Sequence, residues 1–247
     1  MPLLEKFDAA GQLKSGLGHV GKDPTSVVFD RLNSATEGVV EGRKTILAGT
    51  NNYLGLTFDP DCIAAGVAAM QSWGTGTTGS RMANGSYAAH GALEAELADL
   101  YQCSSAMVFS TGYAANLGVL TALLGKGDAV LLDSDAHASL YDGCRMSEAD
   151  IYRFKHNDVK SLERRIARLG DRARRCLIIV EGVYSVLGDR APMKEIAEIK
   201  ERYRARLLVD EAHSLGVFGE RGCGVAEEQG ELDKVDFTVG TFSKSLG

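Results

Sequence analysis

Short apolar runs alternate with longer stretches of helical spacing along most of this chain. The runs occupy residues 106–109, 129–132, 176–180, 207–209 and 237–239. The stretches between them repeat apolar residues every three or four positions, over residues 93–100, 113–124, 159–169 and 192–203. Strands so short and so apolar are buried on both faces, as in a parallel sheet whose strands are joined by helices. The pattern therefore predicts an α/β fold with a mostly parallel sheet and helices on both faces.

The composition excludes several classes of protein. Lys and Arg total 27 against 33 Asp and Glu, a net charge of −6, so no nucleic-acid partner is expected. No apolar run is long enough to cross a bilayer, and charged residues near the start replace the apolar core of a signal peptide. The 5 Cys are scattered without a CxxC pair, which favours neither a disulfide framework nor a zinc site. These features predict a cytoplasmic protein of the size of an enzyme domain.

Polar residues follow each apolar run, at the point where the strand is expected to end. They are Ser110, Asp133, Glu181, Asp210 and Thr241. In open α/β sheets the ligand binds outside the carboxyl ends of the strands, so these residues predict one polar pocket. The alternative is that they cap helices, since Ser, Thr and Asp are good N-cap residues.

Two of these strand ends carry specific chemistry. Lys244 follows the last run and stands between Ser243 and Ser245. A lysine in such a place can form a Schiff base with an aldehyde cofactor, although a lone lysine is usually a solvated charge. Asp210 ends a buried strand and needs a cationic partner there, which a protonated pyridine nitrogen would provide.

Three other segments are weighed against ordinary structural interpretations. Residues 74–79 match GxGxxG, but a helical stretch precedes them instead of a strand, so a dinucleotide site is rejected. Residues 110–116 lie between a strand and a helix, where a phosphate can bind; a capped helix is the alternative. His137 lies just past a strand end, where it is a catalytic or a structural histidine.

Taken in order, these segments resemble the α-oxoamine synthases, fold-type I enzymes that use pyridoxal 5'-phosphate (PLP). That family condenses an amino acid with an acyl thioester and releases CO2. The resemblance runs from about residue 45 to residue 247. Its motifs are NYLG at 52–55, GSR at 79–81, STGY at 110–113, DAHAS at 135–139, EGVYS at 181–185, DEAHS at 210–214 and GTFSKS at 240–245. Within the family, the last two motifs and segments 58–61 and 141–144 are most similar to bacterial serine palmitoyltransferases.

The resemblance implies a role for each matching residue. Lys244 would carry PLP covalently, Asp210 would pair with the ring nitrogen, and His137 would stack on the ring; these three are the expected catalytic residues. His213 would hydrogen-bond the ring hydroxyl, with Ser185 nearby. The expected phosphate contacts are Gly112, Tyr113, Thr241 and Ser243, Asn52 would position the substrate amino acid, and no metal is expected.

The implied reaction joins L-serine to palmitoyl-CoA and gives 3-ketosphinganine, CoA and CO2, the first step of sphingolipid synthesis. The implied assembly is a homodimer with shared active sites, and peripheral contact with a membrane stays open. One departure complicates the substrate: Asn51 is more typical of branches that use alanine or glycine, such as 8-amino-7-oxononanoate synthase or 2-amino-3-ketobutyrate CoA ligase. A noncatalytic partner subunit is a further alternative.

The expected organisation has two parts. Residues 1–55 would form an N-terminal helix and an extended segment near residues 45–48, and residues 56–247 the PLP-binding large domain. Because relatives are longer, the chain is expected to be a fragment without the C-terminal small domain and to be inactive alone.

Overall fold

The computed structural model describes residue 11 and residues 27–247, so the helix expected near the N-terminus lies outside the described residues. The chain divides into two compact units, residues 1–50 and 51–247. In the first unit, strands β1 (Arg31–Ser34), β2 (Glu37–Val40) and β3 (Arg43–Ile46) form an antiparallel sheet in that order. Glu41 and Gly42 both have positive φ angles, of 50° and 72°, as a two-residue hairpin loop between β2 and β3 requires.

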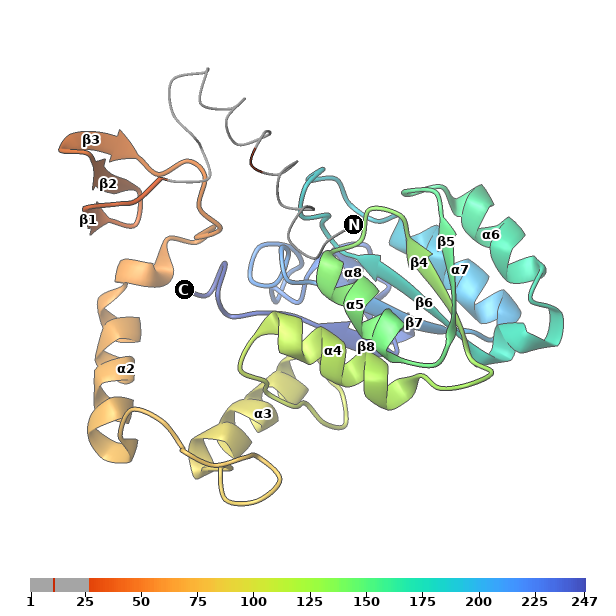
Figure 1. The fold of residues 1–247 in the computed structure, drawn as a ribbon, viewed down its shortest axis with the longest axis horizontal. Helices are drawn as coiled ribbons and strands as arrows, with labels where there is room; N and C mark the ends of the chain where they lie inside the picture. Colours follow the sequence, from red (N-terminus) through yellow and green to blue (C-terminus); the bar gives the residue numbers. More distant parts are fainter. Residues whose placement is uncertain (1–10, 12–26) are drawn as a thin grey trace. The chain divides into compact units, whose positions relative to one another are not determined.

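The second unit is built on a five-stranded parallel sheet (Figure 1). Its strand order is β5-β4-β6-β7-β8, and because all neighbouring strands are parallel, their carboxyl ends lie at the same edge of the sheet. The strands are β4 (Ala129–Asp133), β5 (Asp150–Phe154), β6 (Cys176–Glu181), β7 (Arg206–Asp210) and β8 (Phe237–Val239). The predicted parallel sheet is therefore confirmed.

The helices and helical turns of this unit are η2 (Leu56–Phe58), α2 (Pro60–Trp73), α3 (Ala88–Leu100), α4 (Gly112–Leu123), α5 (Ala138–Met146), α6 (Val159–Ala167), η3 (Gly170–Arg175), α7 (Met193–Tyr203), α8 (Val225–Glu228) and η4 (Leu232–Lys234). All four helical stretches expected from spacing are present. Among the described residues, no helix has both the length and the apolar character that a membrane span requires.

Successive side chains of a strand point to opposite faces of the sheet, so neighbouring residues of the central strands pack against different helices. Leu131 of β4 belongs to the core cluster that contains residues of α6, α7 and α8. Its neighbour Leu132 belongs to the cluster that contains residues of α4 and α5. Both leucines are fully buried. Helices thus cover both faces of the sheet, as the sequence predicts.

The expected strand at residues 106–109 is wrong. No described strand pairs with this segment, and its backbone groups bond to side chains instead. The Val108 N–H donates to Glu94 at 2.9 Å, and the Val108 carbonyl accepts from Arg81 at 3.1 Å. An apolar run becomes a strand only where a neighbouring strand supplies the ladder of hydrogen bonds.

Strand β5 was not expected, because its sequence Asp-Ile-Tyr-Arg-Phe alternates polar and apolar residues instead of forming a continuous run. It is an edge strand that pairs with β4 alone in the described sheet. An edge strand can carry exposed polar side chains such as Arg153, so the apolar pattern of β5 is weaker than that of the central strands.

Candidate active site

A pocket of about 220 Å³ lies at the carboxyl edge of the sheet in the second unit. Its lining comes from the first turns of α4 and α5, from the ends of β6 and β7, and from the segment after β8. The lining side chains expected from sequence are Gly112, Tyr113, His137, Asp210, His213, Thr241, Ser243 and Lys244. Residues far apart in the chain therefore meet here because parallel strands place their carboxyl ends together.

Asp133 ends β4 but does not line this pocket, contrary to the expectation that all five strand ends share it. Its carboxylate accepts hydrogen bonds from Asp135 N–H at 2.9 Å and Asn157 N–H at 3.0 Å. The carboxylate of Asp133 therefore binds the backbone of the loops that follow β4 and β5 and does not face the pocket. Of the five residues expected there, Glu181, Asp210 and Thr241 line the pocket; Ser110 does not, although its neighbours Thr111 and Gly112 do.

The amine of Lys244 lies 2.8 Å from Nε2 of His213, and Nδ1 of that ring lies 2.6 Å from the Tyr53 hydroxyl. Burial, together with the charges of Lys244 and His137, lowers the pKa of His213 to about 4, so the ring is neutral at pH 7. A protonated lysine can only donate, so Nε2 then accepts and Nδ1 carries the ring hydrogen. The imidazole fixes the direction of the Lys244 side chain.

Burial also lowers the pKa of Lys244, although the charges of Asp210 and Glu181 act in the opposite direction. No carboxylate of the described residues lies within ion-pair distance of its amine. The neutral amine is the form that attacks an aldehyde, and a desolvated lysine reaches it more readily than a surface lysine. Lys244 thus has the environment of a nucleophile.

Asp210 ends β7 and is only 4% exposed. Its Oδ2 accepts from Asn116 Nδ2 at 2.8 Å, and its Oδ1 accepts from the Ala212 N–H at 3.0 Å. A buried carboxylate is costly unless donors or a cation compensate it, and these two donors carry no full positive charge. The site therefore suits a cationic ligand group.

Asn116 connects Asp210 to His137. The second hydrogen on its Nδ2 goes to Ser139 Oγ at 2.9 Å, and Ser139 Oγ lies 2.7 Å from His137 Nδ1. His137 is the N-cap residue of α5, and its Nδ1 also accepts from the Ser139 N–H. This chain of hydrogen bonds fixes the ring of His137 relative to the carboxylate of Asp210.

Three side chains with hydroxyl groups line the pocket where α4 begins and after β8: Thr111, Thr241 and Ser243. Thr111 caps α4, with its Oγ1 accepting from the Ala114 N–H at 3.0 Å. Thr241 and Ser243 lie 2.9 Å apart through their hydroxyl oxygens. A Cβ added to Gly112 would lie 3.2 Å from the Thr241 Cβ, so a larger residue would crowd the two loops. Free N–H groups at the start of α4 and these hydroxyls form a site suited to a phosphate.

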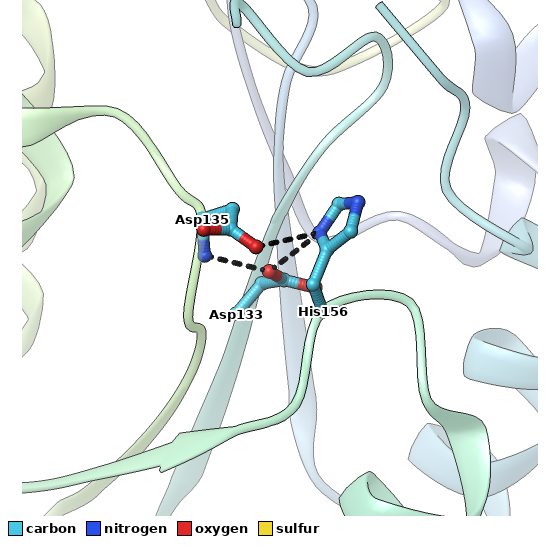
Figure 2. Close-up of side chains that lie close together, drawn as sticks. All are labelled: Asp133, Asp135 and His156. Carbon is cyan, nitrogen blue, oxygen red and sulfur yellow. Dashed lines mark hydrogen bonds and ion pairs between the residues drawn. The ribbon is translucent and has the colours of Figure 1, made fainter. Parts of the chain in front are cut away.

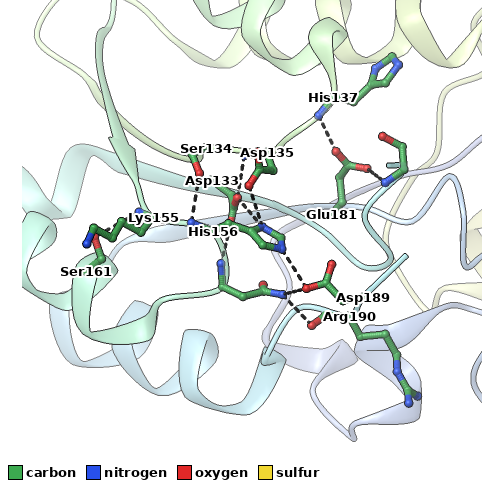
Figure 3. Close-up of polar contacts among 12 residues, drawn as sticks. Asp133, Ser134, Asp135, His137, Lys155, His156, Ser161, Glu181, Asp189 and Arg190 are labelled. Carbon is green, nitrogen blue, oxygen red and sulfur yellow. Dashed lines mark hydrogen bonds and ion pairs between the residues drawn. The ribbon is translucent and has the colours of Figure 1, made fainter. Parts of the chain in front are cut away.

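Glu181 lines the pocket from the end of β6. Burial raises its pKa to about 7, with a further contribution from the charge of Asp210. Its Oε1 accepts from the His137 N–H at 2.5 Å and its Oε2 from the Ser185 N–H at 3.1 Å (Figure 3). The carboxyl group of Glu181 thus joins the two loops that carry His137 and Ser185.

Ser185 and Asn52 are not among the residues that line the pocket. Ser185 reaches it indirectly, through its bond to Glu181. Asn52 donates from Nδ2 to the Thr57 hydroxyl at 2.8 Å. Tyr113 lines the mouth and donates from its hydroxyl to Asp142 at 2.7 Å, a bond that raises the pKa of the tyrosine.

Two residues with a part in the site were assigned no role from the sequence: Tyr53 and Asn116. Glu181 was expected at the pocket as a strand-end residue, and it lines the pocket. Asn116 lies three residues after Tyr113, hence one helical turn on from the expected phosphate site. That spacing places Asn116 on the same face of α4 as Tyr113, and this was the sequence feature from which its place in the pocket could have been predicted. Tyr53 lies far away in the sequence, and only the fold brings it to His213.

His156 forms a separate cluster with three carboxylates beside this pocket. Figure 2 shows Nδ1 of His156 facing Asp133, at 2.9 Å, and Asp135, at 3.8 Å. Nε2 lies 2.9 Å from Asp189. Asp133, Asp135 and His156 have the donor types and spacing of a metal site, with ligand atoms within 4.8 Å of one another. Because both ring nitrogens already face carboxylates, the imidazole favours its protonated form, which cannot ligate a metal.

The family model for aminotransferases of class I and II matches residues 43–247 of this chain. The chain belongs to this aminotransferase family. Family members therefore provide the comparison for the pocket described above.

Among curated family members, the serine palmitoyltransferase of Caulobacter vibrioides is 57% identical over 247 residues, which is 100% of this chain and 61% of the relative. The 8-amino-7-oxononanoate synthase of Pelobacter propionicus is 45% identical over 211 residues, covering 84% of this chain and 53% of that enzyme. A solved structure of S. paucimobilis serine palmitoyltransferase with a bound PLP–myriocin aldimine matches with a TM-score of 0.96 and 50% identity. That match covers 100% of this chain and 62% of the solved chain. This chain thus spans about three fifths of the length of these relatives.

We expect the His156 cluster to make stability depend on pH. Burial lowers the pKa of His156, but the hydrogen bonds that its ring donates to Asp133 and Asp189 outweigh this effect and leave the pKa above its ordinary value of 6.5. A histidine with a raised folded-state pKa contributes most below the unfolded pKa, and this contribution is lost as pH rises through the folded one. The difference in unfolding free energy between the wild type and His156→Gln should therefore be largest below pH 6.5 and shrink at higher pH.

Chemical denaturation across this pH range measures that difference. His90→Gln is the control, because no carboxylate of the described residues lies within ion-pair distance of His90, and its Nδ1 accepts the Tyr87 N–H. A difference for His156→Gln that stays constant with pH would contradict the ion-pair assignment.

Proposed function

We propose that the protein containing this chain is a PLP-dependent enzyme that condenses L-serine with palmitoyl-CoA, giving 3-ketosphinganine, CoA and CO2. The observation that carries the proposal is the position of Lys244, held by a neutral His213, in the same pocket as the buried carboxylate of Asp210. The 57% identity to a serine palmitoyltransferase supports the choice of substrates. Residues 56–247 would form the PLP-binding domain of a cytoplasmic enzyme.

The residues of the pocket fit PLP at both of its ends. The hydroxyls of Thr241 and Ser243 and the first turn of α4 would hold the phosphate, with Gly112 leaving space between the loops. Asp210 lacks a cationic partner that a pyridinium nitrogen would supply. His137 would lie against the ring, and His213 would contact its hydroxyl. Bound there, PLP supplies an aldehyde for Lys244 and an electron sink for charge at the amino acid Cα.

The residues of this chain would divide the work as follows. Asp210 keeps a negative charge at the ring nitrogen, where a protonated ring accepts electrons best. Lys244 Nζ, once released by the substrate amine, takes the proton from Cα, and its lowered pKa suits a base working near neutral pH. His137, fixed through Ser139, orients the substrate carboxylate.

A second candidate function keeps the chemistry and changes the substrates to alanine or glycine with another acyl-CoA. Asn51 favours it, and the structure gives Asn51 a route to the site: the Tyr53 hydroxyl donates to Asn51 Oδ1 at 3.2 Å and also contacts His213. The 45% identity to an 8-amino-7-oxononanoate synthase is consistent with this candidate. A noncatalytic partner subunit would not need the chemistry of Lys244 and Asp210.

The exposed face of α2 supports a homodimer. Ile63, Val67, Met70 and Trp73 recur every three or four residues along α2, and each is between 42% and 53% exposed. No residue of α2 is buried within the described chain. An apolar helical stripe of this size is typical of a protein interface, and we propose that a second copy of the protein covers it.

Replacing Lys244 tests the covalent role. Lys244→Ala in the full-length protein should remove the borohydride-reducible link to PLP and lower turnover of serine and palmitoyl-CoA by at least about 1000-fold, since the nucleophile and the base are lost together. Mass spectrometry of the reduced protein locates the modified residue. Lys126→Ala is the control, because this lysine is exposed and forms no ion pair with any other residue that the structure describes. A reduced cofactor on another lysine would refute the assignment.

Candidate amino acids distinguish the two substrate proposals. Titration of the PLP-loaded, full-length protein with serine, alanine and glycine should shift the cofactor absorption at the lowest concentration for serine. A stronger response to alanine or glycine would favour the second candidate. Absence of any response together with absence of a lysine-linked cofactor would favour the noncatalytic alternative.

The dimer is tested at the α2 stripe. Val67→Glu/Met70→Glu should convert the dimer to a monomer in light-scattering measurements, because burying two carboxylates costs several times the thermal energy. Met146→Glu introduces a charge at another exposed apolar position, 64% exposed at the end of α5, and should leave the dimer intact. A monomeric wild type, or a dimer that survives the double substitution, would contradict the proposal.

A further inference from the structure

A second hollow lies beside β5 and α6, away from the candidate active site. Its volume is about 520 Å³, within the range of small-molecule sites, and it shares no lining residue with the pocket of Lys244. Its cationic lining residues come from the end of β5, the residue after it, and α6 with its C-cap residue: Arg153, Lys155, Arg164, Arg165 and Arg168. We call it the arginine hollow.

The charges of the arginine hollow are largely uncompensated. Arg164 has one carboxylate near it, Asp158 at 4.0 Å, the limit for an ion pair. Arg153 interacts with the Tyr141 hydroxyl, and no carboxylate of the described chain forms an ion pair with Lys155, Arg165 or Arg168. Other arginines nearby do have partners, since Arg172 and Arg175 pair with Asp150 and Asp128. In a chain with a net charge of −6, this concentration of positive charge is local and specific.

The polar side chains that line the hollow offer donors and few acceptors. Guanidinium and ammonium groups only donate. The Ser134 and Ser161 oxygens already accept the N–H groups of His156, at 3.1 Å, and Lys155, at 3.2 Å, so their hydroxyl hydrogens can be given to a ligand (Figure 3). His156 turns both ring nitrogens toward Asp133 and Asp189. A ligand with several negative acceptor oxygens complements such a lining.

The packing of α6 argues against a membrane as the partner. Leu162 and Ile166, the apolar residues on its inner face, are fully buried in the core with α7. No apolar stripe of α6 is left to enter a bilayer, which an interfacial helix requires. The exposed residues of α6 are Lys160, Arg164, Arg165 and the small Ala167. The hollow beside them is concave, which favours a compact ligand over a flat surface.

We propose that the arginine hollow binds a small phosphate-bearing anion, such as a diphosphate group, at a site separate from the candidate active site. Arginine forks match phosphate oxygens in pairs, and four guanidinium groups around one hollow provide that geometry. The proposal does not depend on the proposed function.

Titration calorimetry with inorganic pyrophosphate and with ADP tests this proposal. The full-length protein is loaded with PLP and freed of excess cofactor, so that phosphate sites at Lys244 do not contribute. Saturable binding is expected, and Arg165→Gln/Arg168→Gln should weaken it by about tenfold or more, since two charge-assisted contacts are lost. Both arginines are exposed and unpaired, so the variant should keep its fold, which circular dichroism checks.

The matched control is Arg174→Gln/Lys194→Gln, which removes the same charge from two exposed residues outside the hollow; neither forms an ion pair in residues 27–247. Its affinity should stay within about twofold of the wild type. Equal weakening in both double variants would indicate diffuse attraction and overturn the proposal. So would the absence of saturable binding of both anions, or binding only to vesicles of phosphatidylcholine and phosphatidylglycerol.

Discussion

The negative charge of Asp210 is buried at the end of β7, and the arrangement of the candidate site depends on it. A carboxylate in such a place is stable only if donors surround it, and the fold supplies the Asn116 amide and the Ala212 N–H. Asn116 in turn fixes Ser139 and His137, so the first turns of α4 and α5 are oriented by the same group. The remaining need of the carboxylate for positive charge creates the preference for a cationic ring.

The sheet explains why this charge and Lys244 meet. Leu208 and Val209 are buried on opposite faces of β7, and β7 pairs in register with β6 and β8. Glu181, Asp210 and the segment after β8 therefore leave the core at one edge. The same low-dielectric surroundings lower the pKa of Lys244 and of His213, so burial favours the neutral amine of the lysine and the neutral imidazole of the histidine. The same buried apolar strands thus form the core and bring the residues of the candidate site together at one edge of the sheet.

Sequence reasoning predicted the sheet and the pocket where the signal was local. Continuous apolar runs identified β4, β6, β7 and β8, and the hydroxyl-flanked Lys244 could be recognised from its neighbours alone. The apolar run at 106–109 was wrongly predicted to be a strand. A strand needs a neighbouring strand to pair with, and the residues of the run do not show whether one is present. β5 was missed because an edge strand tolerates polar residues such as Arg153.

Long-range contacts account for the rest. The Tyr53 hydroxyl reaches His213 across 160 positions, and the Asn116 amide reaches Asp210 across 94, distances that no local pattern reports. Asp133 was grouped with the pocket because it ends a strand, yet β4 lies beside β5, whose loop brings His156 to it. A strand end predicts the edge of the sheet correctly, and the neighbouring loop decides which site receives the side chain.

The role of Asp210 is tested most directly by the rate at which the α-proton of serine exchanges with deuterium in the full-length protein, followed by NMR. Asp210→Asn preserves the shape and removes the charge, so exchange should fall by about 100-fold or more while PLP stays bound. Asp99→Asn changes an exposed aspartate that has no ion pair within the described part of the chain, and this variant should exchange the α-proton of serine at the wild-type rate. Exchange by Asp210→Asn within about twofold of the wild type would contradict the electrostatic account of this site.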